Sequence, residues 1–344
     1  MVDAVHKVNR RTNVLGVGVS AIDMSQAVER MLDARAKRQA GYVCVTGVHG
    51  VIESQRDPEL KKIHNQSFLT VPDGMPTVWM GREQGFTKMG RVYGPDLMLE
   101  VFEKTEALGA GREALGESRD EALDANDGGG TLLDQTANSA FTYPSQDETG
   151  SLNIEGSGSD AESQMPSAQK CFTHFLYGAT EEMLSKLKAN LEKRFPGVQI
   201  VGTYAPPFRP LNENEEAELS AMVSECKPDF FWVGLSTPKQ EKFMADHDPR
   251  ALGAGGGASG FEHVNHPLDC GIMLGVGAAF PIHAGFQKDT PKWIQNAGLQ
   301  WLHRLCMEPR RLWRRYLWIV PTFLWLAFLQ VLGVRKYAIE DRGC

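Results

Sequence analysis

The chain has 344 residues, 42% of them hydrophobic, and a formal net charge of −7 at pH 7. This length and apolar content suffice for a sizeable core in one large or two smaller domains. The acidic average argues against nucleic-acid binding, and the lack of any CxxC pair argues against a zinc ribbon or a thioredoxin-like site.

Residues 1–108 alternate between strand-like and helix-like patterns and are expected to form an N-terminal α/β half. Short apolar runs, typical of buried strands, lie at 14–20, 42–48 and 67–71. Helices are predicted at 25–37, from Val51, at 75–82 and at 95–108.

The pattern is interrupted at 109–170, a segment rich in Gly, Ser and acidic residues that contains GGG and SGSGS. Its composition and weak periodicity predict a disordered insertion. An irregular small subdomain is the alternative.

Order is expected to return in a second α/β half at 171–290, with a Gly-rich insertion near 249–269. Strands are predicted at 171–178, 198–204, 229–236 and 271–280, and helices at 181–194, at 213–226 and from near Pro238. Strands separated by helices of this length indicate βαβ units. The predicted fold is α/β, with a mostly parallel, Rossmann-like sheet covered by helices on both faces.

Residues 291–344 are predicted to form a helical C-terminal appendage, first basic and then apolar. The apolar part, 317–334, is interrupted by Pro321 and Gln330. About 18 helical residues span roughly 27 Å, the lower limit for crossing a bilayer. Because arginines and tryptophans precede this stretch, a segment lying in the membrane interface is favoured, with a single span or packing on the protein itself as alternatives.

The N-terminus carries basic residues but no apolar stretch, so we expect no secretory signal. Sparse cysteine favours a reducing compartment. Together with the appendage, these features predict a cytoplasmic protein attached peripherally to the inner face of the membrane.

Polar residues and glycines follow four of the predicted strands. In α/β sheets, ligands bind beyond the carboxyl ends of the strands, so these segments are expected to meet in one crevice. The four segments are 46–50, 72–76, 234–241 and 275–280, the last of which contains Gly277.

Asp73 is the candidate catalytic residue of this crevice. It follows a strand and precedes Gly74, which lets the backbone approach a ligand closely. A carboxylate here is suited to take the proton from an acceptor hydroxyl. The alternative is a turn aspartate that caps the next helix.

Two polar residues after the second strand are further candidates. Thr46 is suited to bind a sugar or a phosphate, or it serves the turn at the strand end. His49 is a candidate acid or base near neutral pH, or else a satisfied buried or capping histidine.

The segment STPKQE is a candidate phosphate site. A proline in the first helical turn leaves backbone N–H groups free to bind phosphate. Lys239 adds a cation, Gln240 can bond a diphosphate or a sugar, and Glu241 completes the segment. An ordinary helix start with exposed polar residues is the alternative.

Motifs for other cofactors are missing or weak. The glycine pairs lack a complete dinucleotide fingerprint, and no P-loop motif occurs. Asp246-His247-Asp248 follows a predicted helix and is not interpreted as a metal site, and Glu262, His263 and His266 are only weak metal candidates. Without a metal, helix N-termini and the arginines at 304–315 must neutralise a leaving diphosphate, unless those arginines instead contact anionic lipid.

Several segments together resemble a known family. In order, they are VTGVHG, VPDGMPTVW, RVYGPDLM, GLSTPKQEKF, GVGAAF and WIQNAGLQWLHRLCMEPRRLWRRY. The chain is similar to the WecG/TagA/CpsF glycosyltransferases over roughly 14–108, 171–248 and 270–318.

This resemblance implies an inverting hexosyl- or N-acetylhexosaminyl-transferase of the GT-E fold, without metal or cofactor. A UDP-sugar would be the donor and a polyprenyl-diphosphate-linked glycan the acceptor, with the appendage meeting the membrane. Asp73 would be the catalytic base, and Thr46 and Gln240 would contact substrate. The diphosphate would be neutralised by Arg304, Arg311 and Arg314. The full predicted binding set is Thr46, His49, Gly74, Lys239, Gln240, Glu241, Gly277, Arg304, Arg311 and Arg314.

One departure from the family pattern concerns the donor sugar. Many relatives read T-x-N where this chain has Thr46-Gly47-Val48, and Val48 cannot make the contacts of that asparagine. His49 is the nearest polar substitute, so the donor sugar stays open.

The leading hypothesis is therefore an enzyme of exopolysaccharide or other cell-surface glycan synthesis. The alternatives are a non-catalytic membrane-bound module that binds nucleotide-sugar or lipid diphosphate, and, less favoured, a nucleotide-dependent oxidoreductase. A homo-oligomer is left open, and no nucleic-acid partner is expected.

Overall fold

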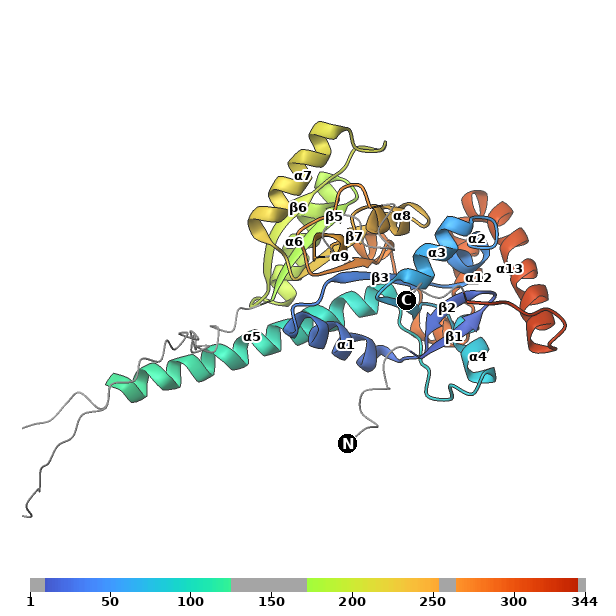
Figure 1. Ribbon diagram of the computed structural model, residues 1–344, viewed down its shortest axis with the longest axis horizontal. Coiled ribbons are helices and arrows are strands. Elements are labelled where there is room, and N and C mark those ends of the chain that lie inside the picture. The colour runs from blue at the N-terminus through green and yellow to red at the C-terminus, as the bar shows by residue number, and fades with distance from the viewer. Residues whose placement is uncertain (1–9, 125–171, 254–263, 340–344) are drawn as a thin grey trace, which may run out of the picture. The chain divides into compact units, whose positions relative to one another are not determined.

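The computed structural model describes residues 10–124, 172–253 and 264–339. The chain divides into two compact units, Met1–Gly109 with Cys171–Cys344, and Ala110–Lys170. The first unit is drawn in Figure 1, where most of its helices and strands are labelled.

Strands and helices alternate along this unit. The strands are β1 (Arg11–Val14), β2 (Val17–Ser20), β3 (Gly41–Thr46), β4 (Leu69–Pro72), β5 (Thr173–Gly178), β6 (Gln199–Tyr204), β7 (Phe230–Gly234) and β8 (Ile272–Gly275). The helices before the second half are α1 (Met24–Ala36), α2 (Val48–Glu53), α3 (Pro58–Gln66), α4 (Met75–Glu83) and α5 (Gly94–Asp124). Those that follow are α6 (Glu181–Arg194), α7 (Glu213–Cys226), α8 (Lys239–Asp246), α9 (Arg250–Gly253), α10 (Ala279–His283), α11 (Lys292–Asn296), α12 (Gln300–Met307) and α13 (Pro309–Val331).

Within the described ranges, six strands form one sheet in the order β4-β3-β8-β7-β5-β6, and every neighbouring pair is parallel. The last strand, β8, lies between β3 of the first half and β7 of the second. The two predicted halves therefore share one sheet. The prediction of an α/β fold with a mostly parallel sheet is confirmed.

Both faces of this sheet are buried. Along β7, Phe230 and Trp232 belong to the same buried cluster as residues of α1, α5 and α6, whereas Phe231 and Val233 cluster with residues of α7 and α8. Successive side chains of a strand point to opposite faces, so a strand covered on both sides must be apolar throughout. This requirement explains the unbroken runs that made the strands predictable.

The structure corrects the first predicted element. The apolar run at 14–20 is not one segment but the turn and second strand of an antiparallel hairpin, β1–β2. Leu15 and Gly16 form its turn with φ of 54° and 84°. A hairpin turn of type I′ needs positive φ at both positions, which glycine adopts freely.

Two further boundaries differ from the prediction. The strand predicted at 271–280 ends at Gly275, and the chain enters α10 at Ala279. Helix α5 runs to Asp124 rather than to residue 108, so the insertion predicted at 109–170 begins with helix. Alanine, leucine, glutamate and arginine are frequent at 109–124 and offset its glycines. The remainder, 125–170, lies outside the described residues, as does 254–263 within the second predicted insertion.

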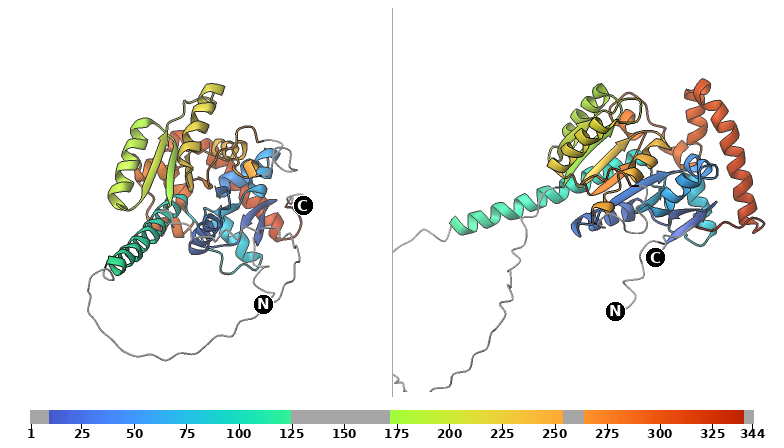
Figure 2. Two further views of the ribbon diagram at one scale, coloured as in Figure 1. Left: turned by 60° about the vertical axis from the view of Figure 1, so that its left-hand side comes forward. Right: turned by 45° about the horizontal axis from the view of Figure 1, so that its top comes forward.

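Helix α13 packs one of its faces onto the protein. Ile319, Phe323 and Ala327 recur at four-residue spacing and are buried against the hairpin, α2 and α4. Figure 2 shows α13 running beside these elements. The opposite face leaves Trp325 and Phe328 61% and 54% exposed. Among the helices of the described residues, none is long and apolar enough to cross a membrane.

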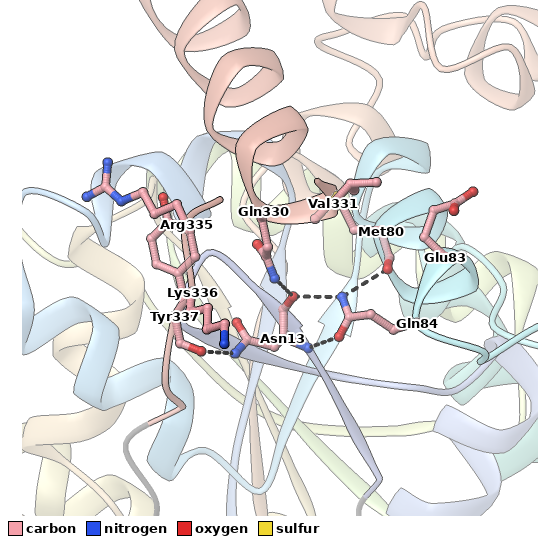
Figure 3. Close-up of a pocket in the computed structure, with 9 residues that line it drawn as sticks. All are labelled: Asn13, Met80, Glu83, Gln84, Gln330, Val331, Arg335, Lys336 and Tyr337. Carbon is pink, nitrogen blue, oxygen red and sulfur yellow. Dashed lines mark hydrogen bonds between the residues drawn. The ribbon is translucent and has the colours of Figure 1, made fainter. Parts of the chain in front are cut away.

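The end of α13 is fastened to the hairpin around a pocket of about 470 Å³ (Figure 3). Gln330 Nε2 donates to the backbone oxygen of Asn13 at 2.7 Å, and Asn13 Nδ2 donates to that of Tyr337 at 2.7 Å. Gln84 Nε2, from α4, also donates to Asn13 O, at 2.8 Å. These amide groups hydrogen-bond to the backbone of neighbouring elements. We therefore interpret the pocket as part of the packing of α13 against β1 and α4, and not as the predicted site.

Candidate active site

The carboxyl ends of four neighbouring strands lie along one edge of the sheet. Thr46 at the end of β3 pairs with Pro72 at the end of β4, and Gly275 ends β8 opposite Cys44 and Val233. All these strands are parallel. The four polar segments therefore follow strand ends on the same side of the sheet, while a crevice between them and the role of each residue there stay predictions.

Asp73 follows β4 directly and reaches across to the start of α5. Its Oδ1 accepts a hydrogen bond from the backbone N–H of Gly94 at 3.2 Å. Gly47 lies beside it, because a Cβ at that position would come within 3.6 Å of Asp73 Oδ2. The following helix, α4, has Gly74 as its N-cap and no side-chain cap. The alternative interpretation, in which Asp73 caps the next helix, is therefore wrong.

Opposing effects set the pKa of Asp73. Burial raises it above the ordinary carboxyl value, whereas the Gly94 hydrogen bond and the charges of Arg91 and Arg304 lower it, and Asp96 raises it again. Burial is the largest of these causes. A carboxylate with a raised pKa is a stronger base, so Asp73 is better suited to proton removal near neutral pH than a solvated aspartate.

A polar network that was not predicted surrounds this carboxylate. Arg91 Nη2 donates to Gln295 Oε1 at 2.7 Å, and the Tyr93 hydroxyl donates to Asp289 Oδ1 at 2.8 Å. Lys292 pairs with Asp96 Oδ1 at 2.5 Å. These contacts tie α11 and the loop before it to the start of α5. Arg91 and Tyr93 belong to the segment RVYGPDLM, which is part of the family resemblance. Neither residue was assigned a role from the sequence.

The appendage contributes one predicted arginine to this network. Burial raises the pKa of Asp73 and of Tyr93, and Arg304, on α12, lies close enough to both for its positive charge to oppose that rise. Arg314, on α13, is exposed, and its guanidinium lies 5.4 Å from the ring of the adjacent Trp313. The side chain of Arg311 lies outside what the structure describes.

The surroundings of His49 disfavour the acid part of its predicted acid–base role. It lies on α2 with Nε2 3.5 Å from Glu53 Oε1. Burial and the charge of Arg315 lower its pKa to about 4. The imidazole is consequently neutral at pH 7 and faces α13, so it can accept or donate a hydrogen bond but is not a ready acid.

The STPKQE segment is more buried than an ordinary helix start. Gln240 and Glu241 are only 3% and 0% exposed, which overturns the alternative of exposed polar residues, although Lys239 is exposed. Gly277 lies against this segment, because a Cβ there would approach Gln240 Oε1 to 3.3 Å. Thr46 Oγ1, at the end of β3, is buried and has no hydrogen-bond partner among the described residues.

The residues considered as metal ligands have other partners or lie outside the described ranges. Asp248 pairs with Arg250, and His247 Nε2 lies 2.8 Å from Glu216 Oε2. Within the described residues, no group of three His, Cys, Asp or Glu side chains could hold a metal ion. Glu262 and His263 fall in the undescribed stretch, whereas His266 precedes β8.

Sequence comparison decides the family. The model described as the glycosyl transferase WecG/TagA/CpsF family matches residues 12–126 and 161–337. The chain belongs to this family.

Two relatives of the family illustrate the similarity. Both are named N-acetylglucosaminyldiphosphoundecaprenol N-acetyl-beta-D-mannosaminyltransferase. The one from Bacillus subtilis (strain 168) is 25% identical over 143 residues, which is 42% of this chain and 47% of the relative. The one from Staphylococcus aureus (strain MW2) is 25% identical over 151 residues, 44% of this chain and 50% of the relative. The chain thus spans about half the length of the curated relatives it matches.

Arg91 gives this family member a testable electrostatic feature. Replacing it in Arg91→Gln removes a positive charge beside Asp73, so the pKa of Asp73 should rise further. Activity that depends on ionised Asp73 should then fall more at low pH than at high pH, in addition to any loss that is the same at every pH. The measurement is kcat/KM against pH for the proposed sugar transfer.

The matched control is Arg35→Gln. Arg35 is also a mostly buried arginine, but it pairs with Asp229 at 2.8 Å. Asp229 directly precedes β7, so this pair lies at the amino ends of the strands, away from Asp73. Its replacement should leave the shape of the pH profile unchanged. An Arg91→Gln profile that superimposes on that of the wild type would remove Arg91 from the electrostatics of the site.

Proposed function

We propose that this chain is an inverting glycosyltransferase that moves a sugar from a UDP-sugar to a polyprenyl-diphosphate-linked acceptor. The observation that carries the proposal is a desolvated carboxylate, Asp73, at a strand edge with Arg91 and Arg304 beside it. The names of the two relatives favour an N-acetylhexosamine as the transferred sugar. The product would enter an exopolysaccharide or another cell-surface glycan.

The reaction is a single displacement. Asp73 accepts the proton of the acceptor hydroxyl as its oxygen attacks the anomeric carbon of the donor sugar. The bond from that carbon to the diphosphate oxygen breaks, and UDP leaves with the electron pair. Because attack and departure occur on opposite sides of the carbon, the configuration inverts.

Arginines and a helix terminus supply the positive charge for the departing diphosphate. Arg304 reaches the site from the appendage, and we assign Arg311 and Arg314 the same task. Arg91 adds a cation from the sheet side, and its Nη1 is buried without a hydrogen-bond partner among the described residues. Lys239 and the N-terminus of α8 complete this positive boundary. We therefore expect the reaction to need no divalent metal.

The exposed face of α13 is proposed to lie in the interface of the cytoplasmic leaflet. Its large apolar side chains with more than half of their surface exposed are Leu317, Leu324, Trp325, Phe328 and Val331. Arginines precede them on the same helix and suit anionic headgroups. Since α12 directly precedes α13, docking of this face would bring Arg304 and the lipid-linked acceptor to one place.

A donor panel tests the proposed function. The full chain in nanodiscs is incubated with individual UDP-sugars, with and without a lipid-diphosphate acceptor, and released UDP is measured. We expect acceptor-dependent release with at least one UDP-N-acetylhexosamine, unchanged by EDTA. Tight binding of UDP-sugar without release from any donor would instead identify a non-catalytic binding module. Loss of release in EDTA would contradict metal independence.

A further inference from the structure

The side-chain amide of Gln240 is held in one orientation. Its Nε2 lies 3.0 Å from Glu241 Oε1, 3.3 Å from the backbone oxygen of Gly275 and 3.5 Å from Thr237 Oγ1. The first two are acceptors under any assignment of protons on the amide. Rotating the amide by 180° would bring Oε1 against these oxygens, so the nitrogen must occupy this side.

This orientation leaves the amide oxygen as an unused acceptor. Gln240 Oε1 is buried and has no hydrogen-bond partner among the described residues. It points toward Gly277, where a Cβ would come within 3.3 Å of it. A buried acceptor without a partner is costly, and a bound ligand that donates a hydrogen bond would remove that cost.

The location of this oxygen indicates which part of the ligand it meets. Gly94, whose N–H binds Asp73, packs on the residue before Gly277, because a Cβ at Gly94 would lie 3.3 Å from Val276 O. Gln240 therefore lies against the short loop after β8, and the proposed base is linked to the same loop through Gly94. A group that lies between them in the proposed reaction is the transferred sugar.

Glu241 is the residue that fixes the amide. Its Oε1 accepts from Gln240 Nε2 and also from the Thr237 hydroxyl at 2.9 Å, and the side chain is fully buried. Without this carboxyl, the Gln240 amide would lose its shortest contact and could turn. Glu241 therefore acts on the ligand only through its neighbour.

We propose that Glu241 is a positioning residue that orients the amide of Gln240, so that Gln240 Oε1 accepts a hydrogen bond from a hydroxyl or acetamido N–H of the donor sugar. The proposal rests on the proposed function and refines it. An ionised diphosphate has no hydrogen to donate to a carbonyl oxygen. Gln240 Oε1 would therefore bind the sugar, while the arginines bind the diphosphate.

The test compares UDP-sugar with UDP alone on the full chain, using the donor that the panel selects. Glu241→Leu puts an apolar side chain of similar size in place of the carboxyl and removes the acceptor. We expect kcat/KM for the UDP-sugar to fall about tenfold or more, since the sugar loses an oriented hydrogen-bond acceptor. Affinity for UDP, measured by calorimetry, should change by less than about threefold.

Two further variants separate positioning from simple structural damage. Glu241→Gln retains an acceptor for the Gln240 amide and should recover most of the lost kcat/KM. The double variant Gln240→Ala/Glu241→Leu should be no worse than Gln240→Ala alone, because the two residues act through one hydrogen bond. Lys242→Ala is the matched control on α8, since Lys242 instead pairs with Asp57 and Glu59.

The outcomes are distinguishable. Additive losses in the double variant, an equal loss of UDP affinity, or no recovery in Glu241→Gln would each overturn the proposal. If Glu241→Leu does not fold, Thr237→Val replaces it as the test, because it removes the hydroxyl that holds Glu241 Oε1. The affinity for UDP-sugar relative to UDP should then fall by about threefold. An unchanged ratio of the two affinities would overturn the proposal. If the wild type turns over no donor, the proposed function fails, while the ratio of UDP-sugar to UDP affinity still reports on the amide.

Discussion

Asp73→Asn should lower acceptor-dependent UDP release roughly 10²- to 10⁴-fold, the usual contribution of a general base. The asparagine is close in size and still offers an oxygen to the Gly94 N–H, so the local structure should persist. Its amide cannot take the proton of the acceptor hydroxyl. Affinity for the UDP-sugar should therefore change by less than about threefold. Kinetics and calorimetry on the same preparation measure both quantities.

Asp57→Asn is the control for this change. Asp57 is also an aspartate with a structural hydrogen bond, because its Oδ1 caps α3 by accepting from the Leu60 N–H at 3.1 Å. It has no place in the proposed site, so transfer should continue at nearly the wild-type rate. If Asp73→Asn were as active as Asp57→Asn, another group would have to be the base.

The second large effect is expected at the exposed face of α13. In the pair Trp325→Glu with Phe328→Glu, two large apolar side chains are replaced by charges. Each apolar side chain withdrawn from the membrane interface costs about 2 kcal/mol, so vesicle binding should weaken about 100-fold or more. Transfer to a membrane-bound acceptor should fall with it. Co-sedimentation with vesicles containing anionic lipid provides the measurement.

These point changes are preferable to deleting α13. Deletion would also expose the core beneath Ile319 and Phe323, which are 2% and 3% exposed. Phe208→Glu is the control, because Phe208 is 93% exposed on the loop after β6 and belongs to no proposed interface. The membrane proposal would be contradicted if the α13 pair and Phe208→Glu sedimented equally with vesicles.

Much of the sheet could be predicted because its physical cause is local. Strands buried on both faces must be continuously apolar, as in GYVCVT and FFWVG, and these runs are legible without any knowledge of contacts. Helix α7 occupies the predicted range, and Asn212 with Glu215 forms the capping box that marks its start. Parallel pairing then puts the ends of the strands, including Thr46 and the residue before Asp73, on one edge.

The hairpin and the end of β8 were missed because their signals are weak. Val-Leu-Gly-Val lacks the Asn-Gly or Asp-Gly pair that usually marks a two-residue turn. After Gly275, the residues Val276, Ala279 and Phe280 are as apolar as the strand itself, although the last two lie in α10. Apolar content alone does not distinguish a buried strand from a short buried helix.

The candidate site was only partly predictable because its electrostatics depend on contacts distant in sequence. Asp73 was found from its place after a strand. Arg91, whose charge lowers the pKa of Asp73, could be linked to Gln295, 204 positions away, only in the folded chain. Likewise, nothing in the sequence near His49 indicates that Arg315 lies close enough to lower its pKa.

The central claim is that the carboxylate of Asp73 removes the acceptor proton in the chemical step. Single-turnover transfer tests it most directly, with wild-type and Asp73→Asn protein each saturated with UDP-sugar and acceptor in identical nanodiscs, because binding and product release then drop out of the rate. We expect the first-order rate of sugar transfer to collapse in Asp73→Asn while wild-type protein completes its turnover. Equal single-turnover rates for the two proteins would contradict it.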